Sequence, residues 1–559
     1  MRRLLPAARF AAGLMLLWAV AVTVHAQTRF GVASAHPLAT QAGEAVLEAG
    51  GNAFDAAVAV AAALGVVEPF SSGFGGGGFF LLHRASDGHE VVVDARETAP
   101  GAATRDMYKD ADGKVDPRAS LDGAKAAGIP GLAAGLDHIA LRYGTRPLAD
   151  LLAPAIRHAE AGYEVDGRYV SAAGWREKAL QADPASAALF LQDGKLPARG
   201  FVVRQPDLAR TLRAIAQRGR AGFYEGAVAA EMVRAVRAGG GIWSETDLAG
   251  YRVVERMPYR IGYRGAIITT APLPSSGGLT LDQALGILEQ FDLAALTETD
   301  RVHLVVEALR RAYQDRARYL GDADYVEVPQ ERLGSPGYHR LRAAGIAADK
   351  ATPSAALDAA PEWQDGQHTT HFSVVDAEGN RVAATLSINA PFGAAWMAGT
   401  SGVLLNNEMN DFAISADTPN LYGLTGFHAN AIAPGKRPLS SMSPTFVEDA
   451  RGVLVFGTPG GSRIITMVLL GLLEHLRLPE VDIARVVGAP RFHHQYLPDR
   501  VEVEPGAFPP AWVSGLAAKG HTVQEGKRRW GNMQAVFVHR VTGTVVVEGD
   551  PRGKAGVLF

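Results

Sequence analysis

Two kinds of hydrophobic spacing divide the chain. Apolar residues spaced every three or four positions predict helices, and apolar residues at every second position predict strands. Before Gly101 this pattern predicts two helices followed by two strands, with Asn52 or Asp55 as the cap of the second helix. The expected elements are helices from Pro37 to near Gly50 and from Asn52 to about Val67, and strands at Phe79–His83 and Val91–Asp94 on either side of the turn Ser86-Asp87-Gly88.

The chain from Gly128 to about Leu320 has mainly helical spacing, with a β-rich interruption near Tyr251–Thr270. Its expected helices are Leu132–Tyr143, Leu148–Ala161, Asp207–Gln217, Ala227–Ala238 and Thr299–Tyr319. Residues 344–367 are small and polar with little periodicity, which is typical of a linker or an exposed loop.

Strand spacing begins abruptly at His368, and the turn Ala377–Asn380 predicts a hairpin. Strands in two blocks, with helices outside them, predict stacked sheets covered by helices. The expected elements are strands at Thr370–Val375, Val382–Ile388, Gly402–Leu405, Thr445–Glu448, Val453–Phe456, Ala535–His539 and Val545–Glu548, and a buried helix at Arg463–Leu476.

The first 26 residues are predicted to be a signal peptide. Three arginines precede an apolar run from Phe10 to about Val24, and Val24-His25-Ala26 offers a cleavage site. A retained membrane anchor is the alternative, but the run is short and no charged stop-transfer flank follows it. The mature chain is expected to start at Gln27 and to be a soluble periplasmic or secreted protein.

Charge and cysteine usage exclude several classes of function. Loss of the three leader arginines changes the formal charge from −3 to −6, and no run of basic residues indicates a nucleic-acid surface. The chain has no cysteine, which excludes disulfides, a thiol nucleophile and a thiolate metal site. We expect no metal and no cofactor.

Two motifs that suggest ligand sites have simpler interpretations. Gly73–Gly78 matches G-x-G-x-x-G, but a helix precedes it and a strand follows, the reverse of a dinucleotide site. Close approach of the backbone to a substrate or a buried strand is the better interpretation. His493-His494 resembles a metal pair, but adjacent side chains point apart, so structural histidines are expected. No G-x-S-x-G motif supports a serine hydrolase of the α/β type.

Hydroxyl groups gather after residue 368. Thr369 and Thr370 open a strand directly after the linker, although adjacent threonines at a strand start usually reflect β-propensity alone. Lys436–Thr445 and Gly457–Arg463 are dense in hydroxyls and glycines. The second segment leads into an apolar helix, whose free N–H groups can receive an anion.

These segments resemble the γ-glutamyltranspeptidase family of N-terminal-nucleophile hydrolases, in the same order and over nearly the whole mature chain. The resemblance rests on Gly75–Phe79, Asp94–Glu97, Thr104–Tyr108, Ala127–Gly131, Thr369–Asp376, Leu404–Phe412, Ser440-Ser441, Gly460-Gly461, Arg491–Gln495 and Gly549–Arg552. It implies a four-layer αββα sandwich and a precursor that cuts itself between His368 and Thr369. The products would be a large subunit, 27–368, and a small subunit, 369–559, that stay together as a heterodimer.

The resemblance also implies the catalytic residues. Thr369 would be the nucleophile, and the amino group created by cleavage would be its base, because such amines titrate near pH ~8. The backbone N–H groups of Gly460 and Gly461 would hold the oxyanion. The second threonine of the family corresponds to Ser387, which keeps the hydroxyl but lacks the methyl group that restricts its rotamer.

The implied substrate is a γ-glutamyl amide such as glutathione, with water, an amino acid or a peptide as acceptor. Arg96, with Ser440 and Ser441, would bind its α-carboxylate. Without the resemblance, Arg96 would be interpreted as a surface ion pair with Glu97 or Asp94. The ammonium would be bound by Asn389, Glu408 and Asp411, and Tyr422 corresponds to the tyrosine of the family's lid loop.

Two alternatives stay open. Acylases that cleave glutaryl-cephalosporins share the fold and the nucleophile, but their substrate has no ammonium and their lid is shorter. A binding protein that is never processed and keeps only the pocket is the alternative outside enzymes. The acidic pair Glu408 and Asp411 and the lid segment favour a γ-glutamyl substrate.

Overall fold

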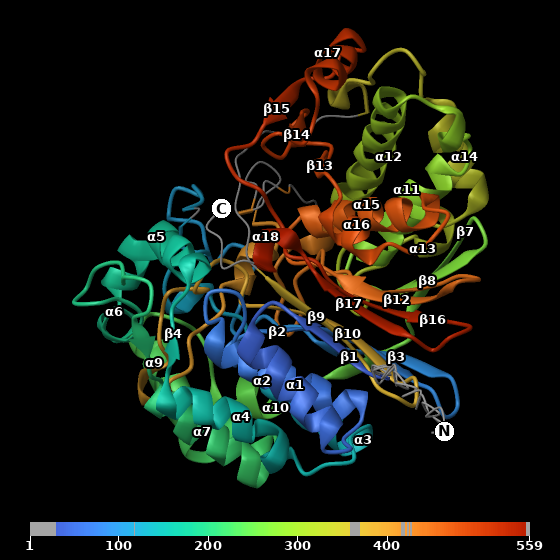
Figure 1. Cartoon of the computed structure of the whole chain (residues 1–559). Helices are drawn as coiled ribbons and strands as arrows, with labels where there is room; N and C mark the ends of the chain where they lie inside the picture. Colours follow the sequence, from blue (N-terminus) through green and yellow to red (C-terminus); the bar gives the residue numbers. More distant parts are fainter. Residues whose placement is uncertain are drawn as a thin grey trace, which may run out of the picture.

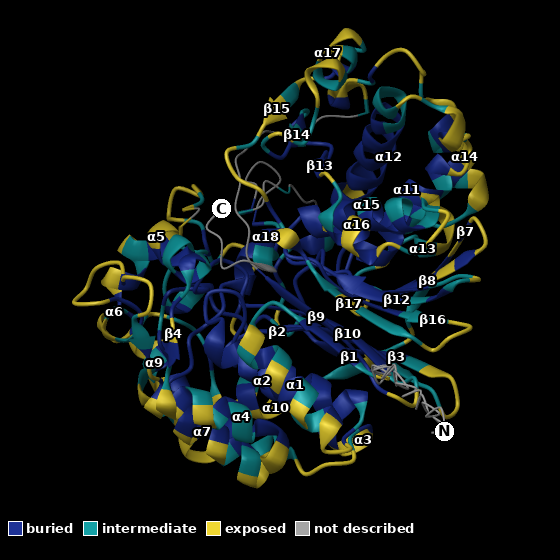
Figure 2. Ribbon diagram, viewed as in Figure 1, coloured by how far each residue is buried: buried dark blue, intermediate teal, exposed yellow. Residues whose placement is uncertain are grey.

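Two β-sheets stacked face to face form the centre of the protein, and helices cover both outer faces (Figure 1). The computed structural model describes residues 29–116, 118–357, 369–414, 420–421, 424 and 428–554. Buried residues fill the central strands of both sheets and the inner faces of the helices, and exposed residues lie mainly on the outer helices and loops (Figure 2). The predicted four-layer αββα sandwich is confirmed.

The first sheet carries the predicted hairpin at its centre. Its strand order is β1-β9-β10-β2-β3-β6, and all neighbouring strands are antiparallel. The hairpin strands are β9 and β10, and the other predicted pair in this sheet is β2 and β3. The strands are β1 (Gly31–Ser34), β2 (Gly77–Arg84), β3 (His89–Ala95), β6 (Val254–Arg256), β9 (Thr370–Val375) and β10 (Arg381–Ser387).

The second sheet combines strands from both sides of residue 368. Its order is β17-β16-β12-β11-β8-β7, again antiparallel throughout. Strands β1, β9 and β10 of the first sheet pack on β12, β16 and β17. The strands are β7 (Tyr259–Tyr263), β8 (Ala266–Thr270), β11 (Thr445–Glu448), β12 (Gly452–Gly457), β16 (Gln534–His539) and β17 (Val545–Gly549).

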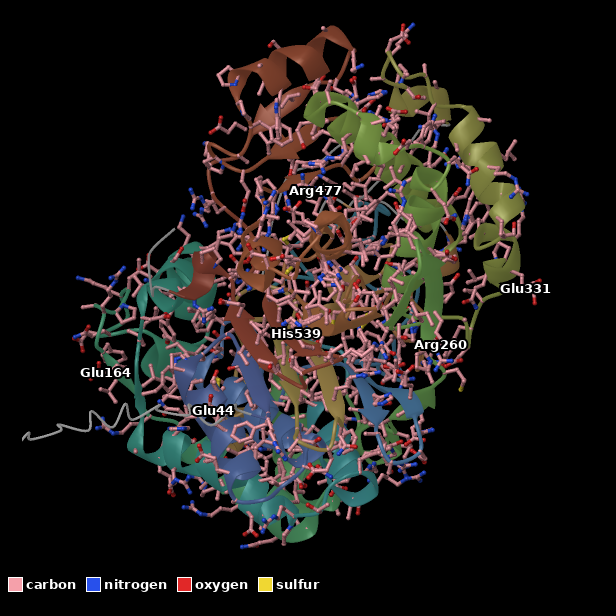
Figure 3. The ribbon with its side chains drawn as sticks, turned by 45° about the vertical axis from the view of Figure 1, so that its right-hand side comes forward. Glu44, Glu164, Arg260, Glu331, Arg477 and His539 are labelled. Carbon is pink, nitrogen blue, oxygen red and sulfur yellow. The ribbon has the colours of Figure 1, made fainter. Side chains whose placement is uncertain are left out.

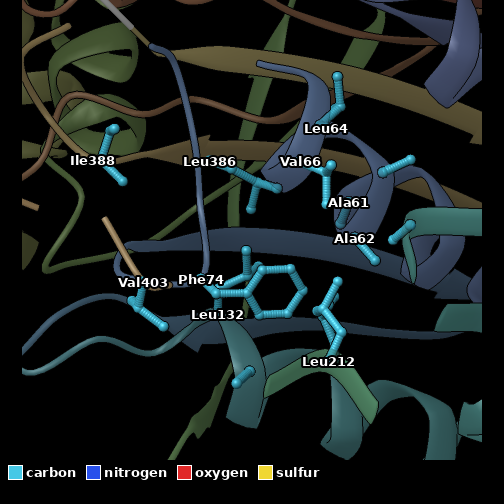
Figure 4. Close-up of a cluster of buried hydrophobic side chains, with 14 of the residues drawn as sticks. Ala61, Ala62, Leu64, Val66, Phe74, Leu132, Leu212, Leu386, Ile388 and Val403 are labelled. Carbon is cyan, nitrogen blue, oxygen red and sulfur yellow. The ribbon is translucent and has the colours of Figure 1, made fainter. Parts of the chain in front are cut away.

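One helical layer covers the first sheet. Its central helix, α2 (Ala53–Val67), is buried along its whole length, which its alanine- and valine-rich sequence permits. Of the two caps expected from the sequence, Asn52 is the N-cap, and Asp55 at the third helical position completes a capping box with it. Leu64 of α2 packs in the same cluster as Phe74, Leu132 and Leu386 (Figure 4). The other helices of this layer are α1 (Pro37–Glu48), α3 (Leu132–Arg142), α4 (Leu148–Ala161) and α7 (Pro206–Arg218).

The other layer covers the second sheet. It consists of α11 (Gly277–Leu288), α12 (Glu298–Tyr319), α15 (Arg463–Arg477) and α16 (Ile483–Gly488). Charged side chains such as Glu164, Arg260 and Glu331 are exposed (Figure 3). No helix among the described residues combines the length and the apolar character needed to cross a membrane.

Smaller elements surround the sandwich. The remaining helices are α5 (Gly167–Ala182), α6 (Pro184–Phe190), α8 (Ala221–Tyr224), α9 (Gly226–Ala238), α10 (Glu245–Gly250), α13 (Gln330–Leu333), α14 (Pro336–Ala344), α17 (Pro510–Ala518) and α18 (Pro551–Lys554). The remaining strands are β4 (Tyr163–Glu164), β5 (Val202–Val203), β13 (Phe492–His493), β14 (Val501–Val503) and β15 (Val523–Glu525).

Two expectations from the sequence were wrong in part. Gly402–Leu405 is not a strand, because Leu404 and Leu405 make only isolated bridges, to Met397 and Gly75. The described start of the linker is not simply exposed: Ala351 and Ser354 are buried, and Ser354 Oγ donates to the carbonyl of Tyr496 at 2.6 Å. Residues 358–368 lie outside the described residues.

The glycine motif and the histidine pair have the structural roles expected of them. A Cβ at Gly75 or Gly76 would lie 2.0 or 2.1 Å from a neighbouring carbonyl oxygen, which explains the need for glycine there. His493 bonds Thr466 and Gln495, whereas His494 bonds Asp499.

Candidate active site

The hairpin of β9 and β10 places two hydroxyl groups together. Thr369 directly precedes β9, and the pairing of Thr370 with Leu386 brings Ser387 opposite Thr369. The two side-chain oxygens are 3.5 Å apart, and the Asn389 N–H donates to Ser387 Oγ at 2.7 Å. Thr369 is 6% exposed. The predicted nucleophile and its predicted helper therefore meet at the end of a rigid central strand pair.

Thr369 and Ser387 line a cavity of about 300 Å³. The cavity brings together the residue that follows β3, strand β10, residues 408–411, helix α12 and the start of α15. It contains nine of the predicted site residues. Its lining residues are Arg96, Arg316, Thr369, Ser387, Asn389, Glu408, Asp411, Leu424, Leu439, Ser440, Ser441, Met442, Gly461, Ser462 and Ile464.

Arg96 pairs with the acidic side chains on one side of the cavity. It follows β3, is completely buried, and its Nη1 lies 2.8 Å from Glu408 Oε2. Its Nη2 donates to Asp411, and Glu97 lies 3.6 Å from Nη1. Arg96 is thus not in a surface ion pair, and its guanidinium contacts the two carboxylates that were predicted to bind the ammonium.

Burial shifts the protonation of this acidic cluster. It raises the pKa of Glu97 to about 8 and the pKa of Glu408 well above its ordinary value, although the charge of Arg96 opposes both shifts. Glu408, Asp411 and Glu97 together raise the pKa of Arg96 against the effect of its burial. Three carboxylates face one guanidinium, so part of the cluster stays protonated near neutral pH.

Arg316 is a second buried cation on the cavity wall, and the sequence analysis did not identify it. Its Nε donates to Ser276 Oγ at 2.8 Å and its Nη2 donates to Ser441 Oγ at 3.2 Å. It makes no ion pair within the described residues, and burial lowers its pKa to about 10. Leu309, Ala312, Tyr313 and Arg316 share one face of α12, so an arginine on an apolar stripe was the available signal.

The glycine pair lies between β12 and α15, beside Thr369. Gly460 and Gly461 have φ angles of +144° and +55°, which a side chain would strain. Gly461 lines the cavity described above, whereas Gly460 borders a neighbouring, larger cavity together with Thr369. Because the pair lies just before a buried helix, the backbone N–H groups of Gly460 and Gly461 are well placed to stabilise a negative charge.

A metal site is not favoured among the described residues. His303, Glu307 and His521 lie close enough to share an ion. However, Glu307 is paired with Arg310 and Arg311, and the ring nitrogens of the two histidines are 2.7 Å apart. These contacts occupy the Glu307 carboxylate and both ring nitrogens of His303, and leave only His521 Nδ1 of this group without a hydrogen-bond partner among the described residues.

Two predicted residues are not placed. Tyr422 and His368 lie outside the described residues, so the lid tyrosine and the residue before the predicted cut have no structural account. The other predicted site residues lie around Thr369, although they come from segments separated by more than 300 positions in the sequence.

Comparison with known proteins identifies the family. The sequence model described as "Gamma-glutamyltranspeptidase" matches residues 39–559. The chain belongs to the γ-glutamyltranspeptidase family. It is 42% identical over 528 residues to a glutathione hydrolase proenzyme of Escherichia coli (strain K12), covering 93% of this chain and 90% of the relative.

Acylases also resemble this member of the γ-glutamyltranspeptidase family. An acylase ACY 1 proenzyme of Pseudomonas sp. (strain V22) is 37% identical, with 94% of this chain and 95% of the relative covered. The crystal structure of a cephalosporin acylase from Bacillus halodurans superposes with a TM-score of 0.81 at 29% identity, covering 94% and 95% of the two chains. The fold is therefore common to both activities, and the residues of the cavity have to distinguish them.

Proposed function

We propose that this enzyme is a self-processing glutathione hydrolase and γ-glutamyltransferase that uses Thr369 as its nucleophile. The observation that supports this proposal most strongly is the pairing of Thr369 with Ser387 on the wall of a cavity. The same cavity is lined by two guanidiniums and two carboxylates. This charge pattern matches a γ-glutamyl group, whose α-carbon carries one ammonium and one carboxylate.

Maturation would begin when the Thr369 hydroxyl attacks the carbonyl of His368. The peptide becomes an ester, which water hydrolyses to leave residues 27–368 and a chain that starts with Thr369. The new α-amino group is the base that the precursor lacks. One residue then supplies both nucleophile and base.

In the mature enzyme the amine of Thr369 would accept the hydroxyl proton as Oγ attacks the γ-carbonyl carbon. The N–H groups of Gly460 and Gly461 would stabilise the oxyanion. The C–N bond then breaks, and the leaving amine takes the proton from the Thr369 ammonium. Water or an amine acceptor then attacks the resulting ester and gives a proton to the Thr369 amine. The amine passes this proton to Oγ as the ester bond breaks, which releases glutamate or a new γ-glutamyl compound and restores the Thr369 hydroxyl.

The α-carboxylate of the substrate would lie towards Ser440, Ser441 and the two arginines, and its ammonium towards Asn389, Glu408 and Asp411. Arg96 would then do more than bind the carboxylate, because its fork also fixes both acidic side chains. We further propose that residues 1–26 are removed on export, so that the mature heterodimer works in the periplasm or outside the cell.

The test is Thr369→Ala, with Thr369→Ser as the matched control that keeps a hydroxyl. We expect Thr369→Ala to stay as one band on a denaturing gel and to lack activity on γ-glutamyl-p-nitroanilide and glutathione. We expect Thr369→Ser to give two bands and measurable activity. Normal cleavage of Thr369→Ala would contradict the proposal.

Glutaryl-cephalosporin acylase activity is the second candidate, because acylases are among the similar proteins. A glutaryl group has no ammonium, so Glu408 and Asp411 would face nothing of opposite charge on the substrate. We therefore expect glutaryl-p-nitroanilide to be a much poorer substrate than γ-glutamyl-p-nitroanilide. Equal kcat/KM for both would favour the acylase.

A further inference from the structure

Thr369 borders two cavities. The second has an empty volume of about 2330 Å³ and is lined by segments of α5, by residues near Glu68 and by the chain between β15 and β16. Among the described lining residues, Thr369 alone borders both this cavity and the one that contains Arg96. If the acyl group of the substrate occupies the first cavity, the rest of the donor must extend from Thr369 into the second.

Most charged side chains on the wall of the second cavity are already paired. Arg168 contacts Glu68, Arg500 lies 2.6 Å from Glu502, and Arg552 pairs with Glu504. These pairs leave little net charge. The six side chains in these pairs are buried or half-buried at the wall of the cavity.

Lys527, Arg528 and Arg529 are different. All three line the cavity, all three are exposed, and none forms an ion pair or a side-chain hydrogen bond with a described residue. The exposed carboxylate of Glu525 also lines the cavity, but it accepts a hydrogen bond from the Gly506 N–H at 3.1 Å and forms no ion pair with these three side chains. The cavity therefore carries an excess of positive charge on one segment.

Both ends of this basic segment are fixed. The Gly526 N–H donates to the Val503 carbonyl at 2.8 Å, and the Trp530 N–H donates to Glu504 Oε1 at 2.8 Å. Trp530 is 5% exposed, and the guanidinium of Arg463 lies 5.1 Å from its ring centroid. A run of charged residues usually lies on a surface that faces only solvent. Here hydrogen bonds at both ends of the segment keep its charges at the wall of a cavity that extends to Thr369.

We propose that Lys527, Arg528 and Arg529 recognise the negative charge of the leaving group and of the acceptor. The inference rests on the proposed function, and it assigns the second cavity to the part of the donor beyond the scissile bond. Its preferred ligands are peptides with a free C-terminal carboxylate. The dipeptide released from glutathione carries one, whereas an anilide leaving group does not.

The expected effect is moderate because the three side chains are exposed. Surface charge pairs contribute little individually, and salt screens them with a Debye length of about 10 Å at 0.1 M. Acting together, we expect them to raise kcat/KM for a carboxylate-bearing donor by about tenfold over its neutral amide at low ionic strength. The preference should decrease as salt is added.

The experiment compares three donors on the full, processed enzyme: glutathione, glutathione amidated at its glycine carboxylate, and γ-glutamyl-p-nitroanilide. In the wild type we expect the first to exceed the second by about tenfold. In K527Q/R528Q/R529Q we expect the two to become equal, while anilide hydrolysis stays within about twofold of the wild type. R210Q/R213Q/R234Q, which removes exposed arginines of α7 and α9, should keep the wild-type preference.

Different failures point to different errors. A wild-type enzyme that does not hydrolyse the anilide would contradict the proposed function itself. An unchanged ratio of free to amidated glutathione in the triple variant would overturn only this inference. If that variant does not fold, the salt dependence of the wild-type ratio decides, because a ratio that is flat between 10 mM and 500 mM salt also overturns it. Glycylglycine and its amide, as acceptors, should show the same preference.

Discussion

Replacing Arg96 with methionine would remove the charge that the acidic side of the active site depends on. Among the described residues, Arg96 is the one cation within ion-pair distance of Glu97, Glu408 and Asp411. Methionine keeps a long, flexible side chain in the space but cannot donate a hydrogen bond. The three carboxylates would then lie in a buried site without a counter-charge.

The size of the effect follows from the burial of these groups. Removing one partner of a buried ion pair costs about 3–5 kcal/mol of stability. Glu97 and Glu408 can reduce this cost in Arg96→Met by taking up protons, because without the charge of Arg96 the pKa of both, already raised by burial, rises further in the folded state. The folded state then binds more protons than the unfolded state, so stability falls as pH rises. The loss should be clearly smaller at pH 5 than at pH 8.

The assay is urea denaturation of the uncleaved Thr369→Ala chain, with and without Arg96→Met, at both pH values. Arg84→Met is the control: Arg84 pairs with exposed Asp87, and a hydrogen bond from Arg84 lowers the pKa of Asp87 to about 2. Asp87 is therefore ionised at pH 5 and pH 8, and the control should show a small loss that is the same at both. An Arg96→Met loss that does not change with pH, or that is as small as the control's, would refute the reasoning.

Three further predictions concern catalysis. Gly461→Ala places a side chain at a φ of +55° beside the oxyanion donors, so kcat should fall by about 10²–10³, measured on γ-glutamyl-p-nitroanilide. Arg316→Met should raise KM for γ-glutamyl-p-nitroanilide far more than KM for an analogue without the α-carboxylate. Arg316→Lys should restore part of this difference. Equal changes in KM for both donors would indicate that Arg316 has a purely structural role. Burial raises the pKa of Glu408 and of Glu97, the latter to about 8, so these carboxyl groups lose protons between pH 6 and pH 8. The ratio of kcat/KM for γ-glutamyl anilide to kcat/KM for glutaryl anilide should therefore increase over this range. A ratio that does not change with pH would contradict the assigned ammonium site.

Much of the framework could be predicted from spacing alone. Helix α4 and strands β9 and β11 have the predicted limits, because each has a clear period and a clear boundary. Gly402–Leu405 was misread as a strand because its apolar side chains are buried in the hydrophobic core, although its backbone makes only isolated bridges. Ser354 was assigned to an exposed linker because its partners, Tyr496 and Asp499, are far away in the sequence.

The candidate site was predictable residue by residue only through family resemblance. Thr369 by its own pattern indicates no more than a strand start, and its pairing with Ser387 needs the register of the hairpin. The contact of Arg96 with Glu408 and Asp411 spans more than 300 positions, so no local pattern encodes it. The sequence pattern shows only that Arg316 lies on an apolar stripe, and its place on the cavity wall and the charge of the second cavity require the assembled layers.

The proposed mechanism requires that the chain cuts itself before Thr369 and that the new N-terminus performs the chemistry. Intact-mass measurement and N-terminal sequencing of the purified wild-type protein test it most directly. We expect a small subunit that starts Thr-Thr-His-Phe-Ser and is present in equal amount with the large subunit in the active fraction. Full activity in a chain that is uncleaved, or that is cut at another peptide bond, would contradict it.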